Sequence, residues 1–130
     1  MKDESYENRR QNKRFQVKME VDLKCRDSNL LTRVTTNDLS LGGICFQIDR
    51  RINTDSKLEL GLSLILGPDA VSEILEVNGK VVWCAEEFPG IFQIGAVFSE
   101  LDDEKKSNID TFLEFIRQGI DLNDIPGEET

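Results

Sequence analysis

The chain has 130 residues, of which 38% are hydrophobic and 32% charged, and its formal net charge is -9. This length suits one domain with a single core, and the acidic balance argues against a general nucleic-acid-binding protein, which needs basic surface for phosphate contacts. The chain contains no histidine, which excludes Ser-His-Asp and Cys-His catalysis and a usual zinc site. No apolar run is long enough to span a membrane and the first residues lack an apolar signal region, so we expect a cytoplasmic protein.

Three cysteines, Cys25, Cys45 and Cys84, cannot all form disulfides with one another. Their spacing does not match a metal site, and each lies in a β-like run. We therefore predict that the three cysteines are small, buried or half-buried apolar residues and that the chain has no metal site.

The charge is distributed unevenly along the chain. Residues 9–18 contain five cations and no acid, whereas residues 100–130 contain ten acids and three bases. Residues 1–14 are polar and offer little to bury, so we predict a flexible basic arm. Such a strip on an acidic body suits a small dianion better than a duplex, although a solubilising arm would have the same composition.

From Phe15 the sequence alternates strictly between apolar and polar residues, which predicts a half-buried strand over 15–25. The sequence at 27–29 reads as a turn. Similar patterns predict strands over residues 30–39, 44–48, 57–66, 71–86 and 91–98.

Within 71–86, the pair Asn78-Gly79 can be either a turn between two strands or a bulge in one long strand. We favour the bulge, because Val81, Trp83 and Ala85 then keep one alternating face. On that face Trp83 is predicted to lie in the core rather than to form an exposed stacking platform.

Helical periodicity occurs once, from Ile109 to Ile116. Ser99 and Asp102 are predicted as a capping pair at its start, and Gly119 as its end. About six antiparallel strands followed by this helix predict a mostly-β protein, a six-stranded antiparallel split β-barrel with a C-terminal helix over one open end.

Two short motifs are candidates for a binding site. Arg10 and Arg14 are four residues apart in the basic segment, where their guanidinium groups can bind phosphate oxygens or a guanine edge. Asp38 and Ser40 are two residues apart on a predicted strand and therefore point to the same face, and Gly43 leaves room for close backbone approach. Taken singly, the first motif could be a solvated charge run and the second an ordinary turn.

Together, Arg10-Gln-Asn-Lys-Arg14 and Asp38-Leu-Ser-Leu-Gly-Gly43 resemble the signature of the PilZ domain, a bacterial receptor for cyclic di-GMP. The resemblance extends over roughly residues 9–117. It implies a domain over 15–118, preceded by the 1–14 arm and followed by an acidic tail, 119–130.

By this resemblance, Arg10 and Arg14 would bind phosphates and the Hoogsteen edge of guanine, while Asp38, Ser40 and Gly43 would surround a base. A basic residue at Arg9 is associated in the family with binding of two stacked ligand molecules.

The resemblance further implies a receptor or adaptor rather than an enzyme, needing no cofactor besides its ligand. It would act, as a monomer or weak dimer, on an unidentified protein partner in motility, adhesion or exopolysaccharide production. The alternative is a PilZ-like interaction module that binds no ligand.

Overall fold

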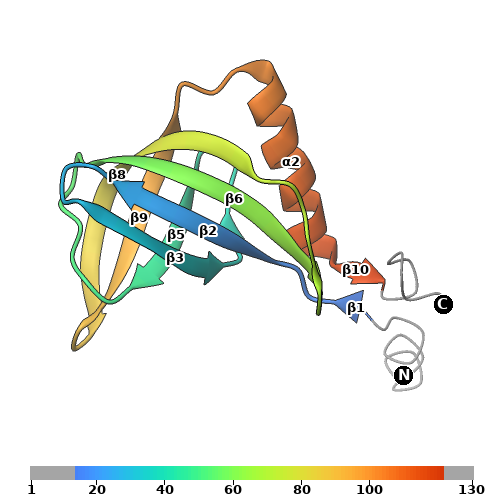
Figure 1. Ribbon diagram of the computed structural model, residues 1–130, viewed down its shortest axis with the longest axis horizontal. Coiled ribbons are helices and arrows are strands. Elements are labelled where there is room, and N and C mark those ends of the chain that lie inside the picture. The colour runs from blue at the N-terminus through green and yellow to red at the C-terminus, as the bar shows by residue number, and fades with distance from the viewer. Residues whose placement is uncertain (1–13, 122–130) are drawn as a thin grey trace, which may run out of the picture.

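The computed structural model describes residues 14–121 (Figure 1). Its helix, α2, spans Asp103–Gln118. The strands are β1 Arg14–Phe15, β2 Lys18–Cys25, β3 Leu30–Thr36, β4 Asp38–Leu39, β5 Gly43–Ile48, β6 Lys57–Gly67, β7 Ala70–Val71, β8 Leu75–Phe88, β9 Ile91–Ser99 and β10 Ile120–Asp121.

All strand pairs are antiparallel, and the main sheet has the order β3-β2-β6-β8-β9-β5-β4, with β7 beside β6. The sheet curls into a half-barrel, and α2 lies across one end of it (Figure 1). Where the two edges of the sheet approach, the Thr36 hydroxyl donates a 2.8 Å hydrogen bond to the Cys45 carbonyl. The predicted mostly-β antiparallel barrel with a C-terminal helix is confirmed, but the main sheet has eight strands among the described residues rather than the predicted six.

The core follows the period of two that strands impose. Met19, Val21, Leu23 and Cys25 are fully buried on one face of β2, and the polar residues between them face outward. The strand predicted over 15–25 is interrupted at residues 16–17, and the strand predicted over 30–39 is interrupted at residue 37. The inward face predicted for the first of these strands is confirmed from Val17 to Cys25.

Helix α2 packs its apolar stripe against the sheet, burying Ile109, Phe112 and Leu113. Asp102 alone is the N-cap, because its carboxylate accepts the Lys105 N–H at 2.8 Å, whereas Ser99, predicted as its capping partner, is the last residue of β9. Gly119 ends the helix as predicted, at a φ of 76° that suits glycine. Within residues 14–121, no helix has the length and apolar character needed to cross a membrane.

The predicted bulge at Asn78-Gly79 is wrong, because both residues pair in regular register with Ser99 and Phe98 on β9. Glycine at 79 reflects crowding instead: an added Cβ would lie 3.1 Å from the Val97 carbonyl oxygen. The interruption in 71–86 falls at residues 72–74, between β7 and β8.

The register of β8 shifts instead between Val81 and Trp83, which pair with the adjacent residues Ala96 and Gly95. Val82 is therefore the extra residue of a bulge, and the residues after it face the side opposite to the predicted one. Val81 is fully buried, but Trp83 is 41% exposed. The prediction that Trp83 is a core residue is therefore wrong. The bulge at Val82 places the Trp83 ring on the outer surface of the sheet.

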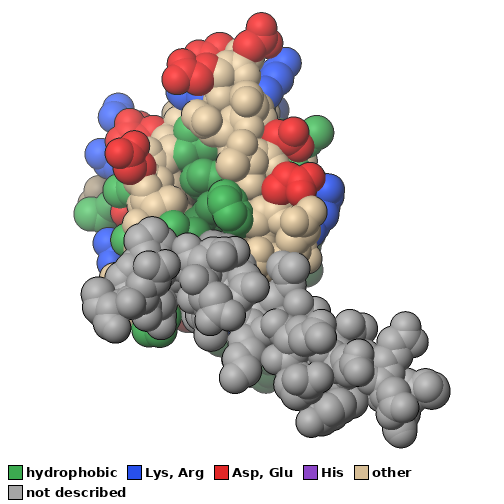
Figure 2. Space-filling model, turned by 90° about the vertical axis from the view of Figure 1, so that its right-hand side faces the viewer, with side chains coloured by type: hydrophobic (Ala, Val, Ile, Leu, Met, Phe, Trp, Pro, Cys, Tyr) green, Lys and Arg blue, Asp and Glu red, His purple; other side chains and the backbone are tan. Residues whose placement is uncertain are grey.

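The face of the molecule seen from the right-hand side of Figure 1 has a central patch of hydrophobic side chains, with acidic groups on both sides and lysine or arginine side chains near its edges (Figure 2). Because the whole chain has a formal net charge of -9, an anionic ligand would need cations brought to it locally.

Candidate functional site

The Asp-x-Ser-x-x-Gly motif forms the hairpin between β4 and β5. Asp38 pairs with Cys45, and the Ser40 N–H donates to the Gly43 carbonyl at 2.9 Å. The Gly43 N–H donates to the Ser40 hydroxyl at 3.2 Å, and that hydroxyl lies 3.3 Å from the Gly43 carbonyl, to which it donates. Ser40 therefore holds the turn that sets the position of Asp38.

The close packing of β5 against β9 requires glycine at position 43. Gly43 pairs with Val97 on β9, and an added Cβ would overlap the carbonyl oxygen of Ala96. The neighbouring Gly42 is unconstrained, since a Cβ there would meet no atom within 4 Å. Glycine at position 43 thus allows β5 and β9 to approach closely beneath the hairpin.

Four cross-strand neighbours form a row on the outer face of the sheet. Asp38 on β4 is opposite Cys45 on β5, Cys45 is opposite Gly95 on β9, and Gly95 is opposite Trp83 on β8. Directly opposed residues of antiparallel strands share a face, so these four side-chain positions adjoin one another.

Gly95 gives the row a notch that the indole of Trp83 fills. A Cβ at Gly95 would overlap three atoms of the Trp83 ring, so the ring lies directly against the backbone of β9. Gly95 is buried beneath it, while 41% of Trp83 remains exposed. The ring is therefore fixed on one side and open to solvent or a ligand on the other.

These residues surround a hollow of about 350 Å³. Its polar groups come from the hairpin, and exposed apolar side chains border it. The lining consists of Asp38, Ser40, Gly42, Gly43, Ile44, Cys45, Val82, Trp83, Gly95, Ala96 and Val97.

The hollow carries a carboxylate but, among the described residues that line it, no lysine or arginine. The Asp38 side chain is exposed and has no hydrogen-bond or ion-pair partner within residues 14–121. A carboxylate accepts N–H groups, so the hollow suits a flat ligand with donors on one edge. Phosphate groups would have to be bound by cations from elsewhere in the chain.

Cys45 lies between Asp38 and Gly95 in the row and is half-buried. Its burial, and secondarily the negative charge of Asp38, raises the pKa of the Cys45 thiol. The thiol is therefore protonated and weakly nucleophilic at neutral pH, and acts as a small uncharged part of the site. Within residues 14–121, no three Cys, Asp or Glu side chains are placed to hold a metal ion.

Substitution of Asp38 by asparagine is expected to speed alkylation of Cys45 by iodoacetamide at pH 8. Removing the nearby negative charge lowers the thiol pKa and raises the fraction of thiolate, the reacting form. Mass spectrometry of digested protein over time would give the rate at Cys45, with Cys84 as the internal control. An unchanged Cys45 rate would contradict the electrostatic contact with Asp38.

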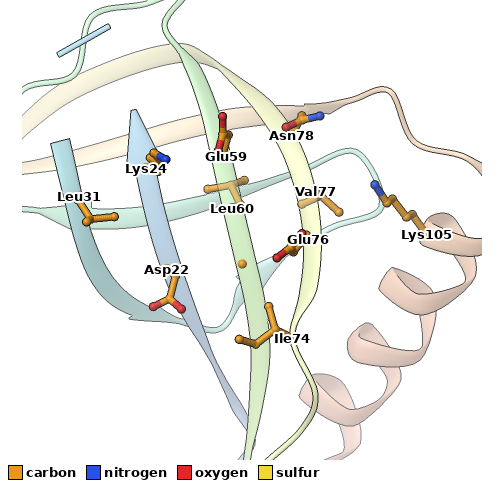
Figure 3. A pocket seen from close by; sticks show the side chains of 11 residues that line it. Asp22, Lys24, Leu31, Glu59, Leu60, Ile74, Glu76, Val77, Asn78 and Lys105 are labelled. Carbon is orange, nitrogen blue, oxygen red and sulfur yellow. The ribbon is translucent and has the colours of Figure 1, made fainter. Parts of the chain in front are cut away.

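A second hollow, of about 370 Å³, lies on the outer face of β2, β6 and β8 (Figure 3). Carboxylates of Asp22, Glu59 and Glu76 border it, and Lys105 extends toward it from α2. Asp22 is already paired with Arg33, whose Nε lies 2.7 Å away. Its lining combines these acids with Lys24 and Lys105 but includes no aromatic side chain on which a base could stack, so it is the weaker candidate for the predicted ligand.

Of the predicted site residues, the structure brings Asp38, Ser40 and Gly43 together in one hairpin. Arg14 lies on β1, whose partner is β10 in a separate two-stranded sheet. Arg9 and Arg10 lie outside the described residues.

The sequence prediction missed Trp83 and Gly95 as site residues. The available signal was a glycine in the middle of the strand predicted over 91–98, a position that a large cross-strand neighbour often covers.

A family model of the PilZ domain matches residues 8–115. No curated protein sequence matches the chain. Because the match covers most of the 130 residues, the chain belongs to the PilZ domain family. PilZ domains are a family of cyclic di-GMP-binding modules and adaptors, not a family of enzymes.

Proposed function

We propose that this protein is a cyclic di-GMP receptor and that the hollow between Asp38 and Trp83 binds one guanine of the ligand. The main support for the proposal is the row Asp38, Cys45, Gly95 and Trp83. In this row an exposed aromatic ring and a carboxylate that has no partner within residues 14–121 line the same hollow. Family membership supports the same ligand.

Guanine matches both groups of the hollow. Its Watson–Crick edge presents N–H donors that a carboxylate can accept, and its flat ring can stack on the exposed face of an indole. Stacking of a base on an aromatic side chain contributes about 1–3 kcal/mol. Asp38 would accept hydrogen bonds from the N–H groups of the guanine Watson–Crick edge. Trp83 would provide the surface on which the guanine ring stacks.

The phosphates require a different part of the protein, because the described lining of the hollow carries no cation. Arg10 and Arg14 supply two guanidinium groups of the kind that bind phosphate bidentately. In the proposed complex the two guanidinium groups neutralise the ligand's two negative charges, while the hollow binds one of its bases. The two separated motifs would thus bind different parts of the ligand: the arginine motif the phosphates, and the motif around Asp38 a base.

Ligand binding would bring the basic arm to the outer face beside the exposed side chains Leu41, Val82 and Val97. The resulting change of surface would be the signal passed to a protein partner. We propose that the output is regulation of motility, adhesion or exopolysaccharide production, in keeping with an adaptor.

Asp38→Ala and Trp83→Ala are each expected to weaken cyclic di-GMP binding about tenfold or more in calorimetric titrations. Phe88→Ala is the matched control, because Phe88 is another aromatic residue of β8, is 60% exposed and does not line the hollow. Its affinity should equal that of the unmodified protein.

Normal binding by both Asp38→Ala and Trp83→Ala would contradict the base site. Absence of binding by the unmodified protein, with GTP as the control nucleotide, would favour a PilZ-like interaction module without a ligand.

A further inference from the structure

A second row of cross-strand neighbours lies beside the row that contains Trp83. Lys57 on β6 is opposite Lys80 on β8, Lys80 is opposite Val97 on β9, and Val97 is opposite Gly43 on β5. The two lysines and Val97 are exposed, so their side chains point outward. Both rows therefore lie on the outer face of the same sheet.

The two rows are adjacent to each other. On β9, Val97 is two residues after Gly95, which belongs to the first row. A strand rises about 3.3 Å per residue, so the rows are about 7 Å apart. Val97 lines the hollow beside Asp38 and also a third hollow, of about 600 Å³, whose lining includes Lys57 and Lys80. The two hollows therefore adjoin at Val97.

The pairing of Lys57 with Lys80 is unfavourable in the protein alone. Like charges directly opposite each other on one face of a sheet repel and lower stability. In the part of the chain that the structure describes, the Lys57 ammonium group has no hydrogen-bond or ion-pair partner. The nearest acid to Lys80 is the exposed Asp55, at 3.9 Å between Nζ and Oδ1. An anion between the two ammonium groups would remove their repulsion.

The acids of the third hollow already have contacts of their own. Glu59 pairs with Arg26 at 2.9 Å, and Glu100 accepts a hydrogen bond from the Asn78 amide at 3.0 Å. The Asp27 carboxylate accepts a backbone N–H at 3.3 Å. The three carboxylates are thus engaged by the protein, whereas the two ammonium groups are available to a ligand.

We propose that Lys57 and Lys80 bind a phosphate of the ligand whose guanine lies against Trp83. This inference rests on the proposed function and adds two binding residues to the same site. Lysine carries its charge on a long, flexible side chain, which suits a phosphate held between two rows about 7 Å apart. A phosphodiester has two unesterified oxygens, so one phosphate can contact a lysine and an arginine of the first motif together. The ligand would then extend from the hollow past Val97 toward Lys80.

The test measures the cyclic di-GMP affinity of Lys57→Gln/Lys80→Gln by calorimetry. This variant should bind about tenfold more weakly at about 20 mM salt, and the difference should fall below about threefold at about 500 mM, because the lost contacts are ionic. The matched control, Lys18→Gln/Lys24→Gln, removes the same charge from exposed lysines of β2 that line neither the third hollow nor the one beside Asp38. Its affinity should change less than about threefold.

Three further measurements separate a ligand contact from a structural role. The urea midpoint of Lys57→Gln/Lys80→Gln should be no lower than that of the unmodified protein, because a repulsive pair is removed. Lys80→Arg keeps the charge and should bind within about threefold of the unmodified protein. In the unmodified protein, saturating ligand should slow acetylation of Lys80 by acetic anhydride, measured by mass spectrometry, without slowing that of Lys24.

Equal affinity of Lys57→Gln/Lys80→Gln and the unmodified protein would overturn the lysine contact while leaving the receptor proposal intact. An equal loss of affinity in the control variant would do the same, as would acetylation of Lys80 at an unchanged rate in saturating ligand. Absence of binding by the unmodified protein would overturn both proposals.

Discussion

The double variant Arg10→Ala/Arg14→Ala is expected to bind cyclic di-GMP about a hundredfold more weakly than the unmodified protein. A hydrogen bond to a charged group contributes roughly 1.5–3 kcal/mol, so each arginine accounts for about tenfold or more. The hollow beside Asp38 has no cation in its described lining that could substitute for the lost charges. Calorimetric titration at a fixed, moderate salt concentration measures the difference.

The control for this variant is Arg26→Ala/Arg117→Ala, which removes the same charge from two exposed arginines that do not line the hollow. Its affinity should change less than about threefold, an effect of net charge alone. If the two double variants lose affinity equally, the arginine motif has no specific role. Unfolding curves should be alike for Arg10→Ala/Arg14→Ala and the unmodified protein.

Gly43→Ala is expected to lower the free energy of unfolding by about 1–3 kcal/mol, although it adds a single methyl group. The added Cβ would overlap the Ala96 carbonyl oxygen, which belongs to the backbone of the adjacent strand and cannot rotate away. Strands β5 and β9 would have to separate at the base of the hairpin that carries Asp38. Urea denaturation followed by circular dichroism measures this loss.

Gly42→Ala provides a closely matched comparison, since it adds the same group one residue earlier where no atom lies within 4 Å. Its free energy of unfolding should stay within about 0.5 kcal/mol of the unmodified protein. Equal stability of the two variants would mean that β5 and β9 are not packed as described.

The parts of the fold that sequence predicted correctly are governed by local periodicity. Alternation along β2 places Met19 through Cys25 in the core, and the spacing from Ile109 to Ile116 defines the face of α2. These patterns arise within one element, so they can be recognised without knowing its neighbours.

The errors concern contacts between strands. Where β8 bulges depends on its register with β9, and the sequence of β8 does not contain that information. Because the register shift occurs at Val82 rather than at Asn78, Trp83 lies on the outer face and not in the predicted core. The reason for glycine at 43 was likewise hidden, because the constraining carbonyl belongs to Ala96, far along the chain.

Part of the site could be predicted because its motif is local. Asp38, Ser40 and Gly43 lie in one hairpin, so their short spacing already implied proximity. The aromatic part, Trp83 over Gly95, is assembled from two other strands by the bulge. It could only be found once the strands were paired.

The central claim, that a guanine of cyclic di-GMP lies against Trp83 in the hollow beside Asp38, is tested most directly by fluorescence. Trp83 is the only tryptophan in the chain, so its intrinsic emission reports on this site alone. Titration with cyclic di-GMP should give a saturable change in emission that GTP at the same concentrations does not reproduce, and Asp38→Ala should shift the midpoint about tenfold higher. Saturable binding detected by calorimetry with no change in Trp83 emission would contradict the placement of the base.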